Sequence, residues 1–290
     1  MKNLLFYLLI ALAPVIYCQV VEVTEVLPST SSDKLYSQGN YKEALNAAED
    51  ALFKQKLGGK QAVQNLNVAV NCLNRLGRQR DFDSLIEKVV VKYDKSWRVL
   101  KDAAQKYLGA THYGYMIGNQ FERGWNRRSG RSINCYDRDR TRAIQLYVKA
   151  MPLVVAHGSA YDKRYFFSSF AGVFQSDWQM LHLTDYSRLP EYSSTHSNYN
   201  RWNASGAPVD AEGNPVYYHI PSSWEKAKND GERWRWLLDQ SQKYGNSYAE
   251  MTFASFLWNQ FGVQKMASYG YGKQFSMQKE GPYSVHLLSD

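Results

Sequence analysis

The chain has 290 residues, of which 44% are hydrophobic and 21% are charged. This balance is typical of a globular protein and excludes a wholly disordered chain, and the length leaves room for one large or two small domains. The formal net charge of +8 allows weak attraction to acidic polymers but says nothing about the fold. Aromatic residues are plentiful, with 8 Trp, 22 Tyr and 12 Phe, which suits packed helices or a glycan-binding surface.

The N-terminal sequence MKNLLFYLLIALAPVIYCQ, with residues 1–18 as the signal peptide, predicts export from the cytoplasm. A lysine precedes an apolar run that ends at Cys18, contains Pro14 and is too short to span a membrane comfortably. Ile16 and Cys18 suit the small-residue positions before a cleavage site, so we expect cleavage after Cys18. The alternative is a lipid anchor at Cys18, for which Tyr17 is a poor match. Both hypotheses place the mature protein in the periplasm or cell envelope.

A helical-repeat array is predicted over residues 34–186, after a polar tether at 19–33. The stretch LYSQGNYKEALNAAEDAL places Gly39 in a tight turn, and the helix after it has Ala44 and Ala51 seven residues apart. This stretch resembles the turn and second helix of a tetratricopeptide repeat, in which small residues two turns apart let neighbouring helices approach closely.

Two weaker copies of this pattern follow along the chain. LGRQRDFDSLIEKVV repeats the order of glycine, aromatic residue and apolar helix, but Leu85 stands where the first small residue belongs. DRTRAIQLYVKAM again has alanines seven apart, Ala143 and Ala150. The stretch before it, 124–140, is polar and rich in Gly and Ser, which predicts an insertion rather than a core helix. The repeats are therefore irregularly spaced.

A linker and a C-terminal helical pair are predicted for the rest of the chain. Residues 187–221 are rich in Ser, Asn, Gly and Pro, which predicts a long loop or linker. Residues 222–290 are predicted to hold this helical pair and the start of a further, truncated region. The first helix of the pair is expected to begin at Ser222 or Ser223, with Glu225 closing a capping box.

The tryptophan-rich sequence DGERWRWLLDQ in this helix is either a binding site or a packing face. Five residues recur at spacings of three or four and share one helix face: Trp224, Ala227, Gly231, Trp234 and Leu238. Arg235 and Asp239 are four residues apart and are expected to pair on the exposed side. We therefore interpret the tryptophans as packing residues, with a glycan-binding role as the alternative. A second helix, 248–262, is expected to pack against the first.

Groups suited to catalysis or metal binding are scattered along the chain. The histidines show no H-E-x-x-H spacing, and they are His112, His157, His182, His196, His219 and His286. Besides Cys18, only Cys72 and Cys135 are present, and sequence leaves open whether they form a disulfide. There is no C-x-x-C pair and no G-x-S-x-G motif, and ASYGYGK at 267–273 departs from a phosphate loop. The sequence therefore predicts no enzyme activity and no catalytic, cofactor-binding or metal-binding residue.

An arginine-rich run is the strongest local charge feature. Glu122, Asp137 and Asp139 interrupt it, so a solvated surface of salt bridges is a simpler interpretation than a site for an acidic partner. Its members are Arg123, Arg127, Arg128, Arg131, Arg138, Arg140 and Arg142.

Several long phrases in the second half of the chain carry a family resemblance. They are ERGWNRRSG, LHLTDYSRLPEY, APVDAEGNPVYYHIPSSWEKAKNDGERWRWLLDQ, FASFLWNQFGVQKM and GPYSVHLLSD. Over roughly 110–290 the chain resembles the N-terminal region of bacterial alpha-2-macroglobulin-family proteins. In that family a helical region precedes β-sandwich domains and a protease-sensitive bait segment, and some members carry a Cys-x-Glu-Gln thioester. This chain has no Cys-x-Glu-Gln and no recognisable bait, so no inhibitory residue is carried over.

We therefore expect a mainly α-helical, exported fragment with tetratricopeptide-like hairpins. The resemblance implies a non-catalytic interaction or scaffold region of a protease inhibitor. The expected partners are other domains of the same polypeptide or envelope proteins, with no nucleic acid and no membrane span. The alternatives are a self-standing periplasmic helical-repeat adaptor and a glycan-binding module.

Overall fold

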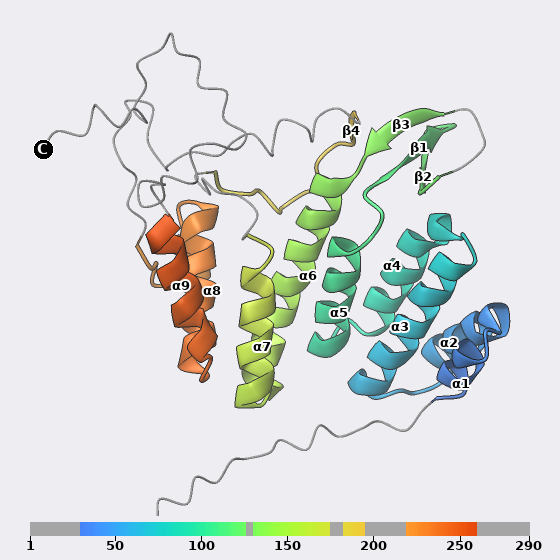
Figure 1. Cartoon of the computed structure of the whole chain (residues 1–290), viewed down its shortest axis with the longest axis horizontal. Coiled ribbons are helices and arrows are strands. Elements are labelled where there is room, and N and C mark those ends of the chain that lie inside the picture. The colour runs from blue at the N-terminus through green and yellow to red at the C-terminus, as the bar shows by residue number, and fades with distance from the viewer. Residues whose placement is uncertain (1–29, 126–129, 175–181, 195–218, 260–290) are drawn as a thin grey trace, which may run out of the picture.

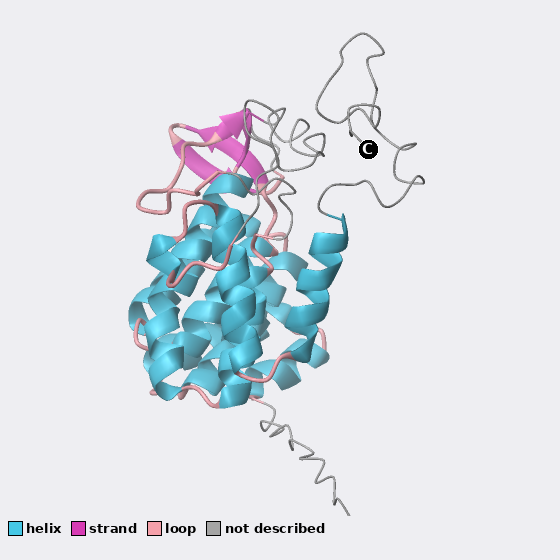
Figure 2. Ribbon diagram, turned by 90° about the vertical axis from the view of Figure 1, so that its left-hand side faces the viewer, coloured by secondary structure: helices cyan, strands magenta, loops and turns pink. Residues whose placement is uncertain are grey.

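The computed structural model describes residues 30–125, 130–174, 182–194 and 219–259, and Figures 1 and 2 show a stack of helices with a small sheet at one end. The prediction of a mainly helical fold is confirmed. The signal peptide, with both hypotheses for Cys18, and the glycine-rich stretch 267–273 lie outside the described residues.

The odd-numbered helices run toward the sheet and the even-numbered helices run back from it (Figure 1). The first group comprises α1 (Ser31–Ser37), α3 (Gly59–Arg75), α5 (Trp97–Leu108), α7 (Ala160–Ala171) and α9 (Ser247–Asn259). The second comprises α2 (Tyr41–Lys54), α4 (Phe82–Lys92), α6 (Tyr136–His157) and α8 (Asp230–Lys243). Consecutive helices therefore form antiparallel pairs, as an array of helical hairpins requires.

The array begins earlier than the predicted tether allows. The Thr30 hydroxyl accepts a hydrogen bond from the Asp33 N–H at 3.2 Å, and the Asp33 carboxylate accepts one from the Thr30 N–H at 3.0 Å. This capping box satisfies two of the free N–H groups at the helix start, so Ser31 to Asp33 form the first turn of α1. The prediction of a tether through residue 33 is wrong at that end.

The turn between α1 and α2 is the one predicted from Gly39. Its φ of +82° is a left-handed conformation that glycine adopts without strain. Ala44 is fully buried on the inner face of α2, but Ala51 is only half-buried, and Ala48 is the second buried alanine. The small residues at the helix contact are thus four residues apart. The predicted burial is confirmed for Ala44 and is wrong for Ala51.

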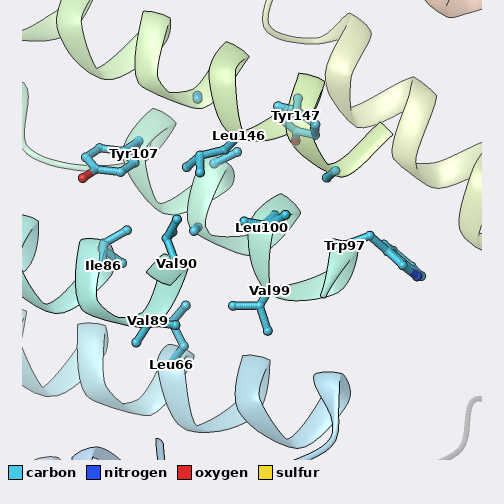
Figure 3. Packing of buried hydrophobic residues seen from close by; sticks show 14 of the residues in the cluster. Leu66, Ile86, Val89, Val90, Trp97, Val99, Leu100, Tyr107, Leu146 and Tyr147 are labelled. Atoms are coloured by element: carbon cyan, nitrogen blue, oxygen red, sulfur yellow. The ribbon is translucent and has the colours of Figure 1, made fainter. Parts of the chain in front are cut away.

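A continuous apolar core runs through the array. Leu66 of α3, Val89 of α4, Leu100 of α5 and Leu146 of α6 are buried in one hydrophobic cluster, and Figure 3 shows part of this cluster in layers between successive helices. Ala143 and Ala150 are both fully buried in α6, as their spacing predicts, and Leu85 is also buried. Burial of apolar side chains at about 25 cal/mol per Å² is the main stabilising contribution of such a core.

A four-stranded antiparallel sheet interrupts the helices, and the sequence prediction missed it. The order is β2 (Gln120–Arg123), β1 (Tyr113–Ile117), β3 (Arg131–Asn134) and β4 (Ser193–Ser194). The predicted insertion at 124–140 is therefore partly a strand, and its end is the start of α6. Residues 187–194 of the predicted linker lie along the fold, because Asn134 pairs with Ser193 in the sheet.

The C-terminal helical pair is present, but its first helix starts later than predicted. Trp224–Lys226 form a short 3-10 helix, η3, and α8 begins at Asp230. The Asn229 side chain accepts from the Glu232 N–H at 2.9 Å, and Glu232 accepts from the Lys228 N–H at 2.7 Å. Asn229 and Glu232 thus supply the cap that was assigned to Ser222 or Ser223 and Glu225. α8 packs against both α7 and α9.

Candidate functional site

Two long connections leave successive hairpins at the same end of the array. The segment 109–135 joins α5 to α6, and the segment 172–229 joins α7 to α8. The first supplies β1, β2 and β3, and the second supplies β4, so the two insertions meet in one sheet at the end that we call the sheet end (Figure 1). In repeat proteins, insertions that gather on one face often form the binding face.

Arg123 fastens this sheet to two helices. Its guanidinium donates to Asp83 of α4 at 2.6 and 3.0 Å and to Asp139 of α6 at 2.7 and 2.8 Å. Burial favours the neutral guanidine, but the hydrogen bonds and charges of both carboxylates outweigh it and raise the pKa of Arg123. Paired, hydrogen-bonded burial is the condition under which a charge is tolerated inside a protein.

Cys135 and His112 complete this cluster without forming a nucleophilic pair. His112 Nδ1 lies 2.8 Å from Asp139 Oδ2, and the Cys135 thiol donates to the same oxygen at 3.4 Å. Burial and the negative charge of Asp139 raise the pKa of Cys135 to about 12. A thiol held in its neutral form is a weak nucleophile. Cys72 and Cys135 are both free and buried, so the disulfide left open by the sequence does not form.

The second insertion is fastened at two places. Beside the sheet, the Arg138 guanidinium donates to the Pro190 carbonyl at 3.0 Å and lies 4.6 Å from the centre of the Tyr192 ring. The centre of the Tyr192 ring lies 4.9 Å from that of Phe121 in β2. This aromatic contact joins the two insertions directly. It brings together residues that are far apart in sequence.

The second fastening is centred on Asp230, which is fully buried at the start of α8. Its carboxylate accepts hydrogen bonds from the backbone N–H and hydroxyl of Thr184, from Arg233 at 3.1 Å and from Arg140 at 3.4 Å. These contacts tie the insertion to α6 and α8. The insertion is therefore held in place at Thr184.

The arginine run is largely structural. Arg123 and Arg140 are buried, and Arg142 donates to Glu87 at 2.6 and 2.8 Å. The prediction of a solvated salt-bridged surface is therefore wrong for Arg123 and Arg140, while Arg131 is exposed on β3. Arg127 and Arg128 lie outside the described residues.

Trp224 of η3 and Trp234 of α8 are packing residues, as predicted. Trp234 is 2% exposed and contacts Phe253 of α9, and Trp224 is equally buried against Phe170. The predicted exposed pair of Arg235 with Asp239 is wrong. Arg235 is 3% exposed and stacks on Phe253, and Asp239 pairs with Lys243 instead.

The remaining histidines within the described residues do not gather into a site. His182 Nε2 lies 3.3 Å from Asp230 Oδ2, and His219 Nδ1 lies 3.2 Å from Glu232 Oε1. His157 is exposed at the end of α6. His196 and His286 lie outside the described residues. Within the described ranges, no cluster of three or more His, Cys, Asp and Glu side chains is arranged to hold a metal ion.

What the sheet end offers to a partner is an exposed set of aromatic and basic side chains. Tyr113 of β1 is 46% exposed, Trp125 just after β2 is 65% exposed, and Arg131 of β3 is exposed. Tyr, Trp and Arg are the residues most enriched at the energetic centres of protein interfaces. Because Arg131 pairs with Met116, Arg131 lies on the opposite face of the sheet from Tyr113, so these residues surround the sheet end rather than share one face. We call the exposed residues Tyr113, Trp125 and Arg131 together the sheet-end surface.

Two findings bear on the wider identity of the chain. In the part of the chain that the structure describes, no helix combines the length and apolar character that a membrane crossing requires. Searches against protein-family models, curated proteins and solved structures found no significant match to this chain.

Proposed function

We propose that this chain is a non-catalytic interaction module that binds a protein partner through the sheet-end surface. The observation that carries the proposal is the pairing of β3 with β4, which joins two insertions from different hairpins into one sheet. The buried ion pair of Arg123 with Asp139 fixes this sheet on the helices, and Asp230 holds the second insertion at Thr184. A surface held by a rigid scaffold loses little conformational freedom on binding, which favours affinity.

The chemistry of the surface supports a protein partner. Tyr113 and Trp125 supply large apolar areas with polar atoms at their edges, and Arg131 supplies a planar group for carboxylates. The sugar-stacking alternative relied on Trp234, which is buried. The Cys135 thiol, whose pKa is raised to about 12, does not supply a nucleophile near neutral pH.

Site-specific photo-crosslinking tests the proposal. A photoreactive phenylalanine analogue replaces Tyr113 in one variant and Tyr165 in another, because both side chains are about half exposed and only the first lies at the sheet end. In cells of the native host, the residue 113 variant should give one discrete crosslinked protein, and the residue 165 variant should not. The same band should disappear when Trp125→Ala is combined with the residue 113 probe. Equal crosslinking from both positions would contradict the proposal.

The family resemblance supports a more specific setting for this module. We propose that it is the helical N-terminal region of an exported alpha-2-macroglobulin-like protease inhibitor, with other domains of the same polypeptide or envelope proteins as its partners. Support comes from the long phrases in residues 207–240 and 253–266, whereas the chain departs from the inhibitory members because it has no Cys-x-Glu-Gln sequence. The chain alone should then leave protease activity unchanged. Stoichiometric inhibition of a protease by this chain would contradict that setting.

A further inference from the structure

The end of the array opposite the sheet is rich in exposed lysines. We call it the short-loop end, and it consists of the connections 55–58, 93–96, 158–159 and 244–246 with the helical turn on either side of each. Figure 1 shows these turns along the lower edge of the helices. Exposed acidic residues in these segments are only Asp94 and Glu250. The exposed lysines are Lys54, Lys56, Lys60, Lys92, Lys95 and Lys243.

Helix capping explains only part of this set. Lys54, Lys92 and Lys243 lie in the last turns of helices, where a cation is favoured by the helix dipole. Lys56 and Lys95 lie in connections, and Lys60 lies in the first turn of α3, where the dipole disfavours a cation. These three lysines therefore contribute positive charge that helix stability does not require.

The acids that pair with Lys54 and Lys243 neutralise little of the charge of these two lysines. Lys54 pairs with Asp50 and Lys243 with Asp239, both at 2.7 Å, but exposed pairs of this kind are weak and yield readily to another anion. Asp162 is engaged by Arg98 at 2.8 Å. At the sheet end, in contrast, Arg123 and Arg140 are committed to buried carboxylates.

An exposed aromatic residue lies at the same end. Tyr248, in the first turn of α9, is 78% exposed. Tyrosine is favoured at the boundary between lipid and water, where its ring contacts the acyl region and its hydroxyl stays hydrated. The chain also enters the fold on this side, because α1 runs from it toward the sheet.

We propose that the short-loop end docks on an anionic membrane surface, with its lysines against lipid phosphates. Lysine acts as a compact point charge that tolerates mobile headgroups, whereas arginine suits the fixed geometry of a bidentate phosphate contact. The six lysines come from three connections along one edge and can reach a flat surface together. This orientation directs the sheet end away from the membrane, and it does not depend on the function proposed above.

Co-sedimentation of the full chain with vesicles tests the docking. Vesicles of phosphatidylcholine with phosphatidylglycerol are compared with vesicles of phosphatidylcholine alone at low and high salt. We expect tighter binding to the anionic vesicles at low salt and loss of that preference at high salt, where charges are screened. Subtracting the binding to neutral vesicles removes any apolar contribution of the N-terminal residues.

Matched charge reversals locate the surface. The triple variant Lys56→Glu, Lys60→Glu, Lys95→Glu should weaken anionic vesicle binding by about 100-fold, at about fivefold per lysine. The control variant Lys42→Glu, Arg188→Glu, Lys226→Glu has the same net charge and changes exposed residues near the sheet end. Circular dichroism confirms that both variants fold.

The control should lose less than tenfold in anionic vesicle binding. Equal losses in the two variants would overturn the docking proposal, because they would show an effect of net charge alone. Tighter binding to duplex DNA than to anionic vesicles at equal phosphate concentration would also overturn it.

Discussion

The helical array and the sheet end are held together by different forces. In the array, apolar side chains such as Leu66, Leu100 and Leu146 are buried in one cluster that extends across successive helices (Figure 3). The sheet is fastened chiefly by Arg123, which donates to carboxylates on two helices. Apolar packing is spread over many contacts, whereas a buried charge depends on each partner. Single substitutions should therefore release the sheet more readily than they open the array.

The largest effect is expected from Arg123→Ala. Asp139 would keep its buried carboxylate without the guanidinium, and breaking a buried pair in this way costs about 3–5 kcal/mol. Urea denaturation followed by circular dichroism measures the loss in unfolding free energy. Arg131→Ala is the matched control, because Arg131 is an exposed arginine in the same sheet and its loss should stay within about 0.5 kcal/mol. Equal losses in unfolding free energy from the two substitutions would contradict the view that buried ion pairs of Arg123 hold the sheet end.

Leu100→Ala tests the array in the same assay. Leu100 is fully buried in α5, so its truncation should cost about 2–5 kcal/mol through lost burial and a cavity. Unlike Arg123→Ala, it should leave photo-crosslinking from position 113 intact at temperatures where the protein is folded. Loss of crosslinking in folded Leu100→Ala protein would show that the two regions are not separable.

Acidification should affect the two regions in opposite directions. Burial raises the pKa of Asp102, in the array, to about 6, and its Oδ2 atom is buried without a hydrogen-bond partner. A raised carboxyl pKa means that the stabilising contribution of the neutral acid is full below the unfolded value of 3.8 and is lost as pH rises through about 6. Asp102→Asn should therefore stabilise the protein at pH 8 by about 1–3 kcal/mol.

At the sheet end, the contribution of Asp139 to stability changes with pH in the opposite direction. Burial opposes ionisation of Asp139, but hydrogen bonds from Arg123 and His112 outweigh it and lower its pKa. Its contribution is present above the unfolded value and is lost as pH falls through the lowered value. Urea titrations from pH 8 to pH 3 should show that the gain in unfolding free energy from Asp102→Asn vanishes by pH 4. The Asp139→Asn variant should be less stable than the unsubstituted protein at pH 7. An Asp102→Asn advantage that grows on acidification would contradict these assignments.

The smallest effect concerns the alanines of α2. Ala44 is fully buried at a helix contact, so Ala44→Leu should overpack it and cost about 1–3 kcal/mol. Ala51 is only half-buried, and Ala51→Leu should cost less because part of the larger side chain can remain in water. Thermal melts of the two variants measure the difference. Identical melting temperatures would mean that the contact lies elsewhere.

Local signals in the sequence predicted the local structure well. Gly39 and the apolar spacing after it predict the first turn and α2, and the spacing of Trp234 with Leu238 predicts a buried helix face. The missed hairpin also has a local signal. Gly118 and Asn119 both have positive φ, and a Gly-Asn pair between alternating residues is typical of a two-residue hairpin turn.

The rest depends on contacts between distant residues. Arg123 meets Asp83 across 40 positions, and no spacing rule in one sequence indicates that pairing. The burial of Arg235 likewise depends on Phe253 of the next helix, whereas the spacing to Asp239 suggested an exposed pair. The candidate site was therefore not predicted, because tertiary contacts create it.

Amide hydrogen exchange of Arg123→Ala tests most directly whether Arg123 holds the sheet as a separate, fixed surface. At pH 7, exchange in the peptides covering β1, β2 and β3 should rise by at least tenfold more than exchange in α3 and α5, which rises only as far as the global loss of unfolding free energy requires. Local opening of a single structural unit gives this pattern. Unchanged protection of the sheet, or an equal rise in the sheet and in α5, would contradict the account.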